Sequence, residues 1–266
     1  MGRKKNLQDL DEFERGYIEG KMNNRVKVTA NEDIVQLKRH NFKVEIKCKN
    51  KKQKDFLNIL KDDKKIICFG IGAAGSGKSY ISLAYALQAL KDESTPYKRI
   101  ICLVPTCEAG AMSIGFLKGD YEQKILPYIS ADQHTMEKVL TNSGNYNAKQ
   151  IIESLELNKI VDYQLVNFAR GKTFDDSIIL INESENYSKE EMLLLLTRIG
   201  ENSKVIISGD KEQLDRKDIK KNGTMCGMEY ALEKLQDMEE VACVEFDTED
   251  IVRHPIISKI INRWKK

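Results

Sequence analysis

The chain has 266 residues, which is enough for one mid-sized α/β domain with an extension and too few for a two-domain nucleic-acid motor. Its 43 Lys and Arg nearly balance its 41 Asp and Glu, so the net charge of +2 exerts no global pull on a polyanion. No apolar run is long enough to cross a bilayer and the charged start is unlike a secretory signal, so we expect a cytoplasmic protein without a membrane partner.

The N-terminal part of the chain differs from the rest in its pattern. Residues 1–46 carry one amphipathic helical pattern and a short alternating stretch, with no group that suggests chemistry. We therefore expect residues 1–46 to form an accessory extension and residues 47–266 to form the functional domain.

Five continuous apolar runs predict buried β-strands, at 66–69, 100–104, 177–181, 204–208 and 241–244. A weaker run at 160–166 is a candidate for a sixth strand. Loops and helical patterns follow these runs, and helices are predicted at 78–90, 188–198 and 225–235 and over the last residues after Pro255. This alternation is typical of an α/β fold in which helices cover both faces of a mainly parallel sheet.

A phosphate-binding loop follows the first of these strands. It is the Walker A pattern formed by Gly72, Ala73, Ala74, Gly75, Ser76, Gly77, Lys78 and Ser79. The glycines let the backbone bend around a phosphate, and the start of the next helix presents free amides with a partial positive charge. We expect Lys78 to reach the β- and γ-phosphates of ATP and Ser79 to bind Mg²⁺, with Tyr80 completing the nucleotide-binding segment. A glycine-rich turn that binds nothing is the alternative.

Polar residues end two further strands. Asn182 occupies the position where a triphosphatase usually carries a magnesium-binding carboxylate, and a neutral amide should hold the metal more weakly. Glu183 is the candidate to polarise the attacking water, although it could also be a solvent-facing strand-end residue. Asp210 and Gln213 follow another strand and are placed to sense the γ-phosphate, although Gly-Asp alone is an ordinary turn.

Beyond these groups, ordered short segments resemble the PhoH-like family of P-loop ATPases, relatives of the superfamily 1 helicases. The likeness extends from Asn50 to about Ile261. The segments that carry it are 72–79, 108–110, 115–120, 122–128, 170–173, 182–186, 196–200, 203–204, 209–213 and 252–255. The resemblance implies a single RecA-like P-loop core.

The resemblance also implies roles for single residues. Gln53 would read the adenine, Glu183 would be the catalytic glutamate, Gln213 would contact the γ-phosphate, and Arg253 would be an arginine finger. The alternatives are a helix-surface residue for Gln53 and a structural ion pair for Arg253. The chain departs from the family pattern at Asn182, at Val104-Pro105 in place of Arg-Pro, and at 111–114, which is one residue longer.

The resulting hypothesis is a Mg²⁺-dependent ATPase coupled to single-stranded nucleic acid, helicase-like, with RNA favoured over DNA. Local support for nucleic acid is confined to the lysines at 47–54 and to Trp264 among basic residues, which could equally be solvated surface and a packed terminus. A single core lacks a second domain to close over ATP, so neighbouring subunits should do so, and the resemblance points to a homo-hexameric ring.

Two other classes of function stay open at this point. One is an ATP-dependent assembly or conformational switch with little or no hydrolysis, because Asn182 lacks the charge of a carboxylate. The other is a small-molecule kinase, since kinases also use Walker A loops; Glu183 with Gln213 and Arg253 favours a hydrolase.

Overall fold

The computed structural model describes residues 42–105, 121–214 and 225–254, together with Ile256, Ile260 and Arg263. The expectations for residues 1–41, for the family-like segments within 106–120 and for Trp264 lie outside these described residues. Of the last residues, Ile256, Ile260 and Arg263 are helical, in the stretch where a terminal helix is predicted.

A single six-stranded parallel sheet forms the centre of the molecule, in the order β3-β2-β4-β5-β1-β6. Its strands are β1 (Ile67–Gly72), β2 (Arg99–Val104), β3 (Val161–Leu165), β4 (Ser177–Ile181), β5 (Lys204–Gly209) and β6 (Val241–Phe246). The predicted strands are therefore confirmed, including the weak sixth one. This sheet and its helices form the α/β, RecA-like arrangement that the sequence predicts.

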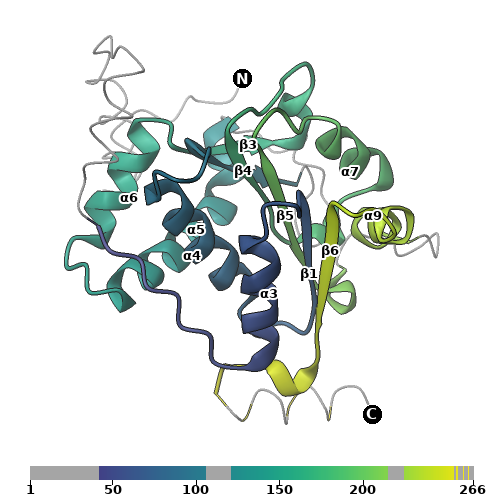
Figure 1. Ribbon diagram of the computed structural model, residues 1–266, viewed down its shortest axis with the longest axis horizontal. Coiled ribbons are helices and arrows are strands. Elements are labelled where there is room, and N and C mark those ends of the chain that lie inside the picture. The colour runs from purple at the N-terminus through teal and green to yellow at the C-terminus, as the bar shows by residue number, and fades with distance from the viewer. Residues whose placement is uncertain are drawn as a thin grey trace, which may run out of the picture.

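Six α-helices are bounded within the described residues, and they cover both faces of the sheet (Figure 1). They are α3 (Lys51–Lys61), α4 (Lys78–Lys91), α5 (Tyr121–Asn142), α6 (Ala148–Leu157), α7 (Lys189–Leu196) and α9 (Gly227–Leu235). Helices α3 to α6 pack on one face, whereas α7 and α9 pack on the other. Short 3-10 turns follow β3, β4, β5 and β6, at Val166–Ala169, Ser184–Asn186, Lys211–Gln213 and Thr248–Asp250.

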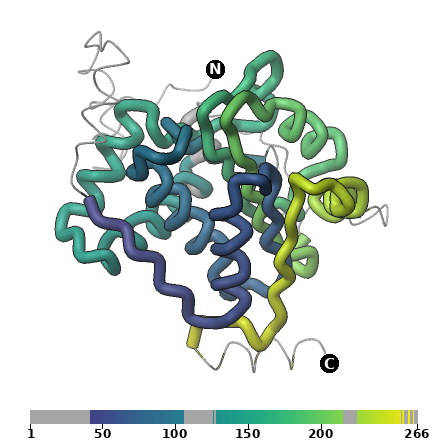
Figure 2. Tube along the Cα trace, in the orientation of Figure 1, coloured from purple at the N-terminus to yellow at the C-terminus, as the bar shows by residue number. Residues whose placement is uncertain are grey.

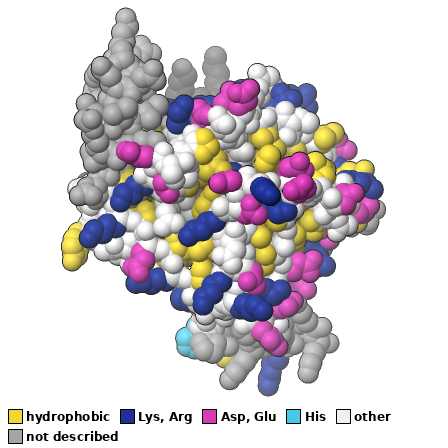
Figure 3. Space-filling view, in the orientation of Figure 1, with side chains coloured by type: hydrophobic (Ala, Val, Ile, Leu, Met, Phe, Trp, Pro, Cys, Tyr) yellow, Lys and Arg dark blue, Asp and Glu magenta, His cyan; other side chains and the backbone are white. Residues whose placement is uncertain are grey.

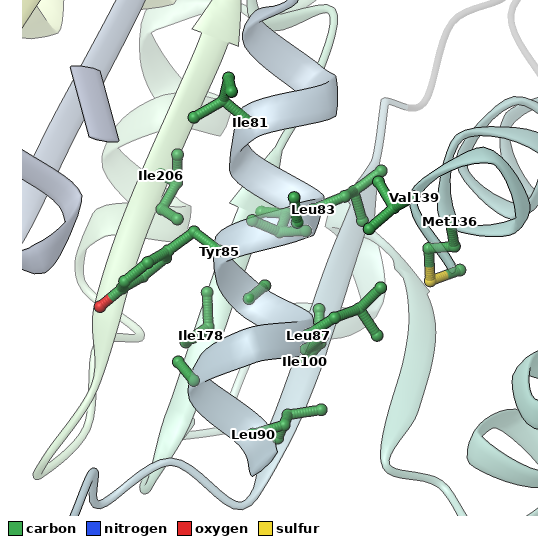
Figure 4. Packing of buried hydrophobic residues seen from close by; sticks show 14 of the residues in the cluster. Ile81, Leu83, Tyr85, Leu87, Leu90, Ile100, Met136, Val139, Ile178 and Ile206 are labelled. Atoms are coloured by element: carbon green, nitrogen blue, oxygen red, sulfur yellow. The ribbon is translucent and has the colours of Figure 1, made fainter. Parts of the chain in front are cut away.

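Helix α4 is the most buried of these helices and lies between the sheet and α5. Figure 4 shows Leu83 and Leu87 of α4 near Val139 and Met136 of α5, while Ile81 approaches Ile206 on the sheet. A helix that is apolar on most sides has to be enclosed by other elements. The helix that starts at the phosphate-binding loop is therefore firmly fixed in the core.

Helices α3, α5 and α6 are absent from the predicted elements. Helix α3 is rich in lysine, but Phe56 and Leu60 lie one turn apart and are fully buried, and the Asn50 side chain caps its start. Helix α5 contains Pro127, a residue that normally argues against a continuous helix. In each case tertiary packing outweighs the local signal.

The strand order decides which loops meet. Strand β5 lies between β1 and β4, and all three run parallel, so their carboxyl ends lie next to one another at one edge of the sheet. The chain after β6 returns to the start of α3, where the Asn50 side chain donates to the Asp250 carbonyl at 3.0 Å (Figure 2). This return brings the residues after β6 close to the phosphate-binding loop.

Charges of both signs are interspersed on the face of the molecule shown in Figure 3, and no area of a single sign dominates the view. None of the helices in the described residues is long and apolar enough to cross a bilayer.

Candidate functional site

The Walker A segment forms a loop between β1 and α4. Gly75 and Gly77 have φ angles of 81° and 89°, in the left-handed region that L side chains rarely adopt, and Gly77 directly precedes α4. The loop therefore has the glycine-dependent shape that leaves backbone amides facing a bound anion.

The Lys78 side chain folds back into this loop and is largely buried. Its Nζ donates to the carbonyl oxygens of Gly72 at 2.5 Å and Ala73 at 2.9 Å, and lies 3.4 Å from the Ser76 hydroxyl. Burial lowers the pKa of Lys78, and the nearby carboxylates, Asp210 first among them, act in the opposite direction. The ammonium group is thus held where phosphate oxygens would replace the loop carbonyls as its partners.

Asp210 connects the end of β5 to this loop. Its Oδ2 accepts a hydrogen bond from the Ala74 amide at 3.0 Å, and the same oxygen accepts from Gln213 Nε2 at 2.9 Å. Asp210 is buried, whereas Gln213 is exposed at the end of the 3-10 turn. The predicted pair thus lies against the phosphate-binding loop, and Asp210 is the member that touches it.

Asn182 is the first residue after β4. Ile178 and Leu180 belong to the core beneath α4 and α5, whereas Ile179 and Ile181 belong to the opposite core. Because side chains alternate along a strand, Asn182 continues toward the α4 side. There its Nδ2 donates to Asp132 Oδ1 on α5 at 3.0 Å.

Asp132 is a half-buried acid that the sequence gives no reason to select. Burial raises its pKa to about 7, and the hydrogen bonds from Asn182 and from the Cys102 thiol oppose this rise. Asp132 lies on α5, 50 residues before Asn182 in the sequence. Only the folded chain brings these two groups together.

Glu183 follows Asn182 and is exposed, in a left-handed backbone conformation with φ 49° and ψ 42°. Such a conformation is strained for a residue other than glycine, and strained residues gather at functional sites. This left-handed conformation turns the chain sharply after β4. The Glu183 side chain therefore does not continue the alternation of side chains along the strand, and it lies exposed at the carboxyl edge of the sheet.

Glu185 is a second carboxyl group that the sequence analysis missed. It is only 1% exposed, its Oε2 accepts from the Asp210 amide at 3.0 Å, and its Oε1 has no hydrogen-bond partner. Burial raises its pKa to about 8, and the charge of Glu183 adds to this rise. Its place two residues after Glu183 was the one sequence signal that could have indicated it.

Gln53, the predicted adenine-reading residue, lies buried against the phosphate-binding loop. Its Nε2 donates to the Ser76 carbonyl at 2.7 Å, and its Oε1 accepts from the Lys49 amide at 2.7 Å. Both ends of the amide are therefore bonded to the protein itself. In this arrangement Gln53 supports the loop.

Arg253 reaches the loop of its own chain. The Val252 amide donates to the Gly75 carbonyl at 3.1 Å, and a Cβ added to Gly75 would lie 2.9 Å from Arg253 Cδ. Arg253 is predicted to be an arginine finger, supplied by a neighbouring subunit that closes over the nucleotide. The contact seen here is within one chain, with an exposed guanidinium beside the loop.

Ser79 lies in the first turn of α4, and the Tyr80 hydroxyl accepts a weak bond from Asn142 of α5 at 3.4 Å. The Tyr80 ring packs against the core between these helices. The structure thus brings Ser79 to the loop and turns Tyr80 toward α5.

The donor set at this edge fits ATP with Mg²⁺. Mg²⁺ prefers oxygen ligands and keeps several waters, and the Ser79 hydroxyl and the Asn182 Oδ1 are oxygen donors. Among the described residues, no cluster of three or more His, Cys, Asp or Glu could hold a metal ion. A magnesium ion here would therefore depend on the nucleotide's own phosphates together with these few protein oxygens.

Comparison with known proteins agrees with this geometry. The family described as PhoH-like protein matches residues 45–265. A PhoH-like protein of Bacillus subtilis is 34% identical over 83% of this chain and 64% of its own length. Protein PhoH of Escherichia coli and a PhoH-like protein of Mycobacterium tuberculosis are each 31% identical, over 58% of their own lengths and 82% and 83% of this chain. The chain thus spans about three fifths of these curated relatives, and it belongs to the PhoH-like family.

Proposed function

We propose that this protein is a Mg²⁺-dependent ATPase whose cycle is coupled to single-stranded nucleic acid, RNA in preference to DNA, in a helicase-like manner. The observation that carries the proposal is the hydrogen bond from the Ala74 amide to Asp210. It joins the phosphate-binding loop to the end of β5, and β5 in turn lies beside the strand that presents Asn182 and Glu183. The phosphate-binding loop and the candidate catalytic groups therefore lie at the same edge of the sheet.

Each group has a distinct task in this proposal. Lys78 and the loop amides hold the β- and γ-phosphates, and Glu183 orients and polarises the attacking water. Gln213 contacts the γ-phosphate, and Arg253 neutralises charge that develops on the transferred phosphoryl group. Mg²⁺, when bound near Ser79 and Asn182, supplies further neutralisation of that charge.

The bond between Ala74 and Asp210 also suggests how the site senses nucleotide. A phosphate that enters the loop competes for the loop amides, and Asp210 is negatively charged and adjacent to it. Occupancy of the loop would thus shift Asp210 and the Gln213 side chain bonded to it. Because Gln213 belongs to the exposed 3-10 turn Lys211–Gln213, a change at Asp210 would also move this surface turn.

A second candidate function is an ATP-dependent switch that changes shape or assembly with little hydrolysis. The observation that favours it is that the Asn182 amide carries no charge and donates a hydrogen bond from its Nδ2 to Asp132. Such a protein would bind ATP and magnesium and release phosphate at a negligible rate.

The nucleic-acid and assembly parts of the proposal depend on family membership and on the single core. The described residues form one core, and in a homo-hexameric ring a neighbouring subunit would supply the surface that closes over the nucleotide. The lysines from 47 to 54 lie before and along the start of α3 and provide a local basic segment for a nucleic-acid backbone.

Steady-state phosphate release tests the proposal. The wild type is assayed with ATP and Mg²⁺, alone and with single-stranded RNA or DNA of equal length, beside the Glu183→Gln variant. We expect release that RNA stimulates more than DNA, and a loss of about 10²–10³-fold in Glu183→Gln with ATP binding kept. ATP binding without phosphate release in any of these mixtures would instead establish the switch.

A further inference from the structure

Asn182, at the candidate magnesium position after β4, carries no charge, but the carboxylate of Asp132 on α5 lies beside it. Asn182 Nδ2 and Asp132 Oδ1 are 3.0 Å apart, and both residues are half-buried. An amide that donates through its nitrogen turns its oxygen the opposite way. The bond to Asp132 therefore fixes which end of the Asn182 amide is free to accept.

The surroundings of Asp132 contain hydrogen-bond donors and no neutralising cation. Its partners are the Asn182 amide and the Cys102 thiol, and no Lys, Arg or His in the described parts of the chain forms an ion pair with it. A carboxylate that is withdrawn from water without a cation is unfavourable in the empty protein. A cation bound close by would remove that cost.

Helix α5 is well placed to hold this acid at the site. Four residues further along, Met136 is fully buried against the same core as α4, and Val139 and Leu140 are buried in that core one turn later. Asp132 thus stands on a rigid helix that packs directly beside the helix bearing Ser79. Its position depends on core packing rather than on a loop.

We propose that Asp132 supplies the negative charge of the magnesium position, in place of the carboxylate that β4 lacks, and orients Asn182 so that its Oδ1 faces the metal's water shell. This inference rests on the proposed nucleotide site. Asp132 acts in it as a positioning residue through its bond to Asn182, and its negative charge would favour a cation bound beside that amide. The sequence departure at Asn182 is thereby compensated from another element.

The test uses the full chain and a non-hydrolysable ATP analogue, AMP-PNP, so that the readout is binding and not turnover. AMP-PNP affinity is measured by calorimetry across a Mg²⁺ titration and in EDTA. The variants are Asp132→Asn, which keeps the shape and removes the charge, and the exchange Asp132→Asn with Asn182→Asp, which returns the charge to β4. Glu137→Gln, which removes a partly exposed acid from the same helix, is the matched control.

We expect Asp132→Asn to raise the Mg²⁺ concentration for half-maximal binding about tenfold, since charge-assisted contacts are about twice as strong as neutral ones. Affinity in EDTA should not fall, the exchange variant should return the midpoint toward the wild-type value, and Glu137→Gln should leave it unchanged. A purely structural role would lower binding equally in both conditions.

An unchanged Mg²⁺ midpoint in a folded Asp132→Asn variant would overturn the inference and leave the nucleotide site intact. If the wild type binds AMP-PNP neither with Mg²⁺ nor in EDTA, both the inference and the proposed function are overturned. Failure of the exchange variant to move the midpoint, with melting temperature retained, would also contradict the inference.

Discussion

Arg253 lies against Gly75 of its own chain, so closely that a Cβ on Gly75 would be 2.9 Å from the arginine Cδ. The neighbouring backbone bond from Val252 to Gly75, at 3.1 Å, fixes this approach. An arginine that neutralises a transferred phosphoryl group can come from the same chain or from a neighbour. Because Arg253 lies beside the loop of its own chain, we predict that it acts there.

Arg253→Ala should therefore keep ATP binding and lower turnover by about 10³-fold or more. When it is mixed with Lys78→Ala under conditions of confirmed subunit exchange, activity should stay as low as in either variant alone, because neither chain has both groups. Recovery of phosphate release in the mixture would show that the arginine acts across an interface, as the sequence analysis expects.

Gln53→Ala should weaken ATP and GTP binding by the same factor, about tenfold, because the variant loses a buried bond to the Ser76 carbonyl and with it support for the loop. Competition binding of the two nucleotides measures this, with Lys54→Ala on the exposed side of the same helix as control. A loss confined to ATP would instead indicate that Gln53 reads the adenine.

The buried carboxyl of Glu185 should make the nucleotide-free protein less stable as pH rises. Its pKa is raised to about 8 from an ordinary value of 4.5, so between these values the folded chain keeps a proton that the unfolded chain has released. The stability present at about pH 5 is thus lost on going toward pH 8, at up to about 1.4 kcal/mol per pH unit.

The charge of Glu183 adds to the rise in the pKa of Glu185, whereas the Asp210 backbone amide, which donates to Glu185, opposes it. The Lys78 ammonium also interacts with the Glu185 carboxylate. Chemical denaturation of Glu185→Gln at several pH values should give a flatter profile and a gain over wild type that grows toward pH 8. The exposed Glu201→Gln serves as control. Parallel profiles for wild type and Glu185→Gln would contradict the assignment.

Lys204 is a fully buried lysine whose Nζ donates to the carbonyls of Leu60 at 2.5 Å and Asp62 at 2.9 Å, at the end of α3. Lys204→Met should lower the free energy of unfolding by about 2 kcal/mol, because it leaves these carbonyls without their partner. Lys98→Met, which removes an exposed ion pair with Asp176, should cost about 0.5 kcal/mol. If the two variants lose the same free energy of unfolding in urea denaturation, the buried contacts of Lys204 contribute no more to stability than the exposed ion pair of Lys98.

The sheet and the phosphate-binding loop could be predicted because continuous apolar runs and a complete Walker motif are local signals. Helix α5 and Asp132 could not, since Pro127 obscured the helix and the acid meets Asn182 only across 50 residues of chain. Glu185 was missed because its importance comes from burial under Asp210, which no local pattern shows. The direction in which the Gln53 amide is bonded likewise depends on the folded loop.

We propose that the loop around Lys78 binds a nucleoside triphosphate, and calorimetry of ATP binding with Mg²⁺ is the sharpest test of this binding. We predict that the wild type binds one ATP per chain and that Lys78→Ala loses about 100-fold or more in affinity, since it removes charge-assisted contacts to phosphate. The nucleotide-free variant should remain folded by circular dichroism, although it loses the bonds from Lys78 Nζ to the Gly72 and Ala73 carbonyls. Equal ATP affinity in the two proteins, or no binding by the wild type, would contradict the account.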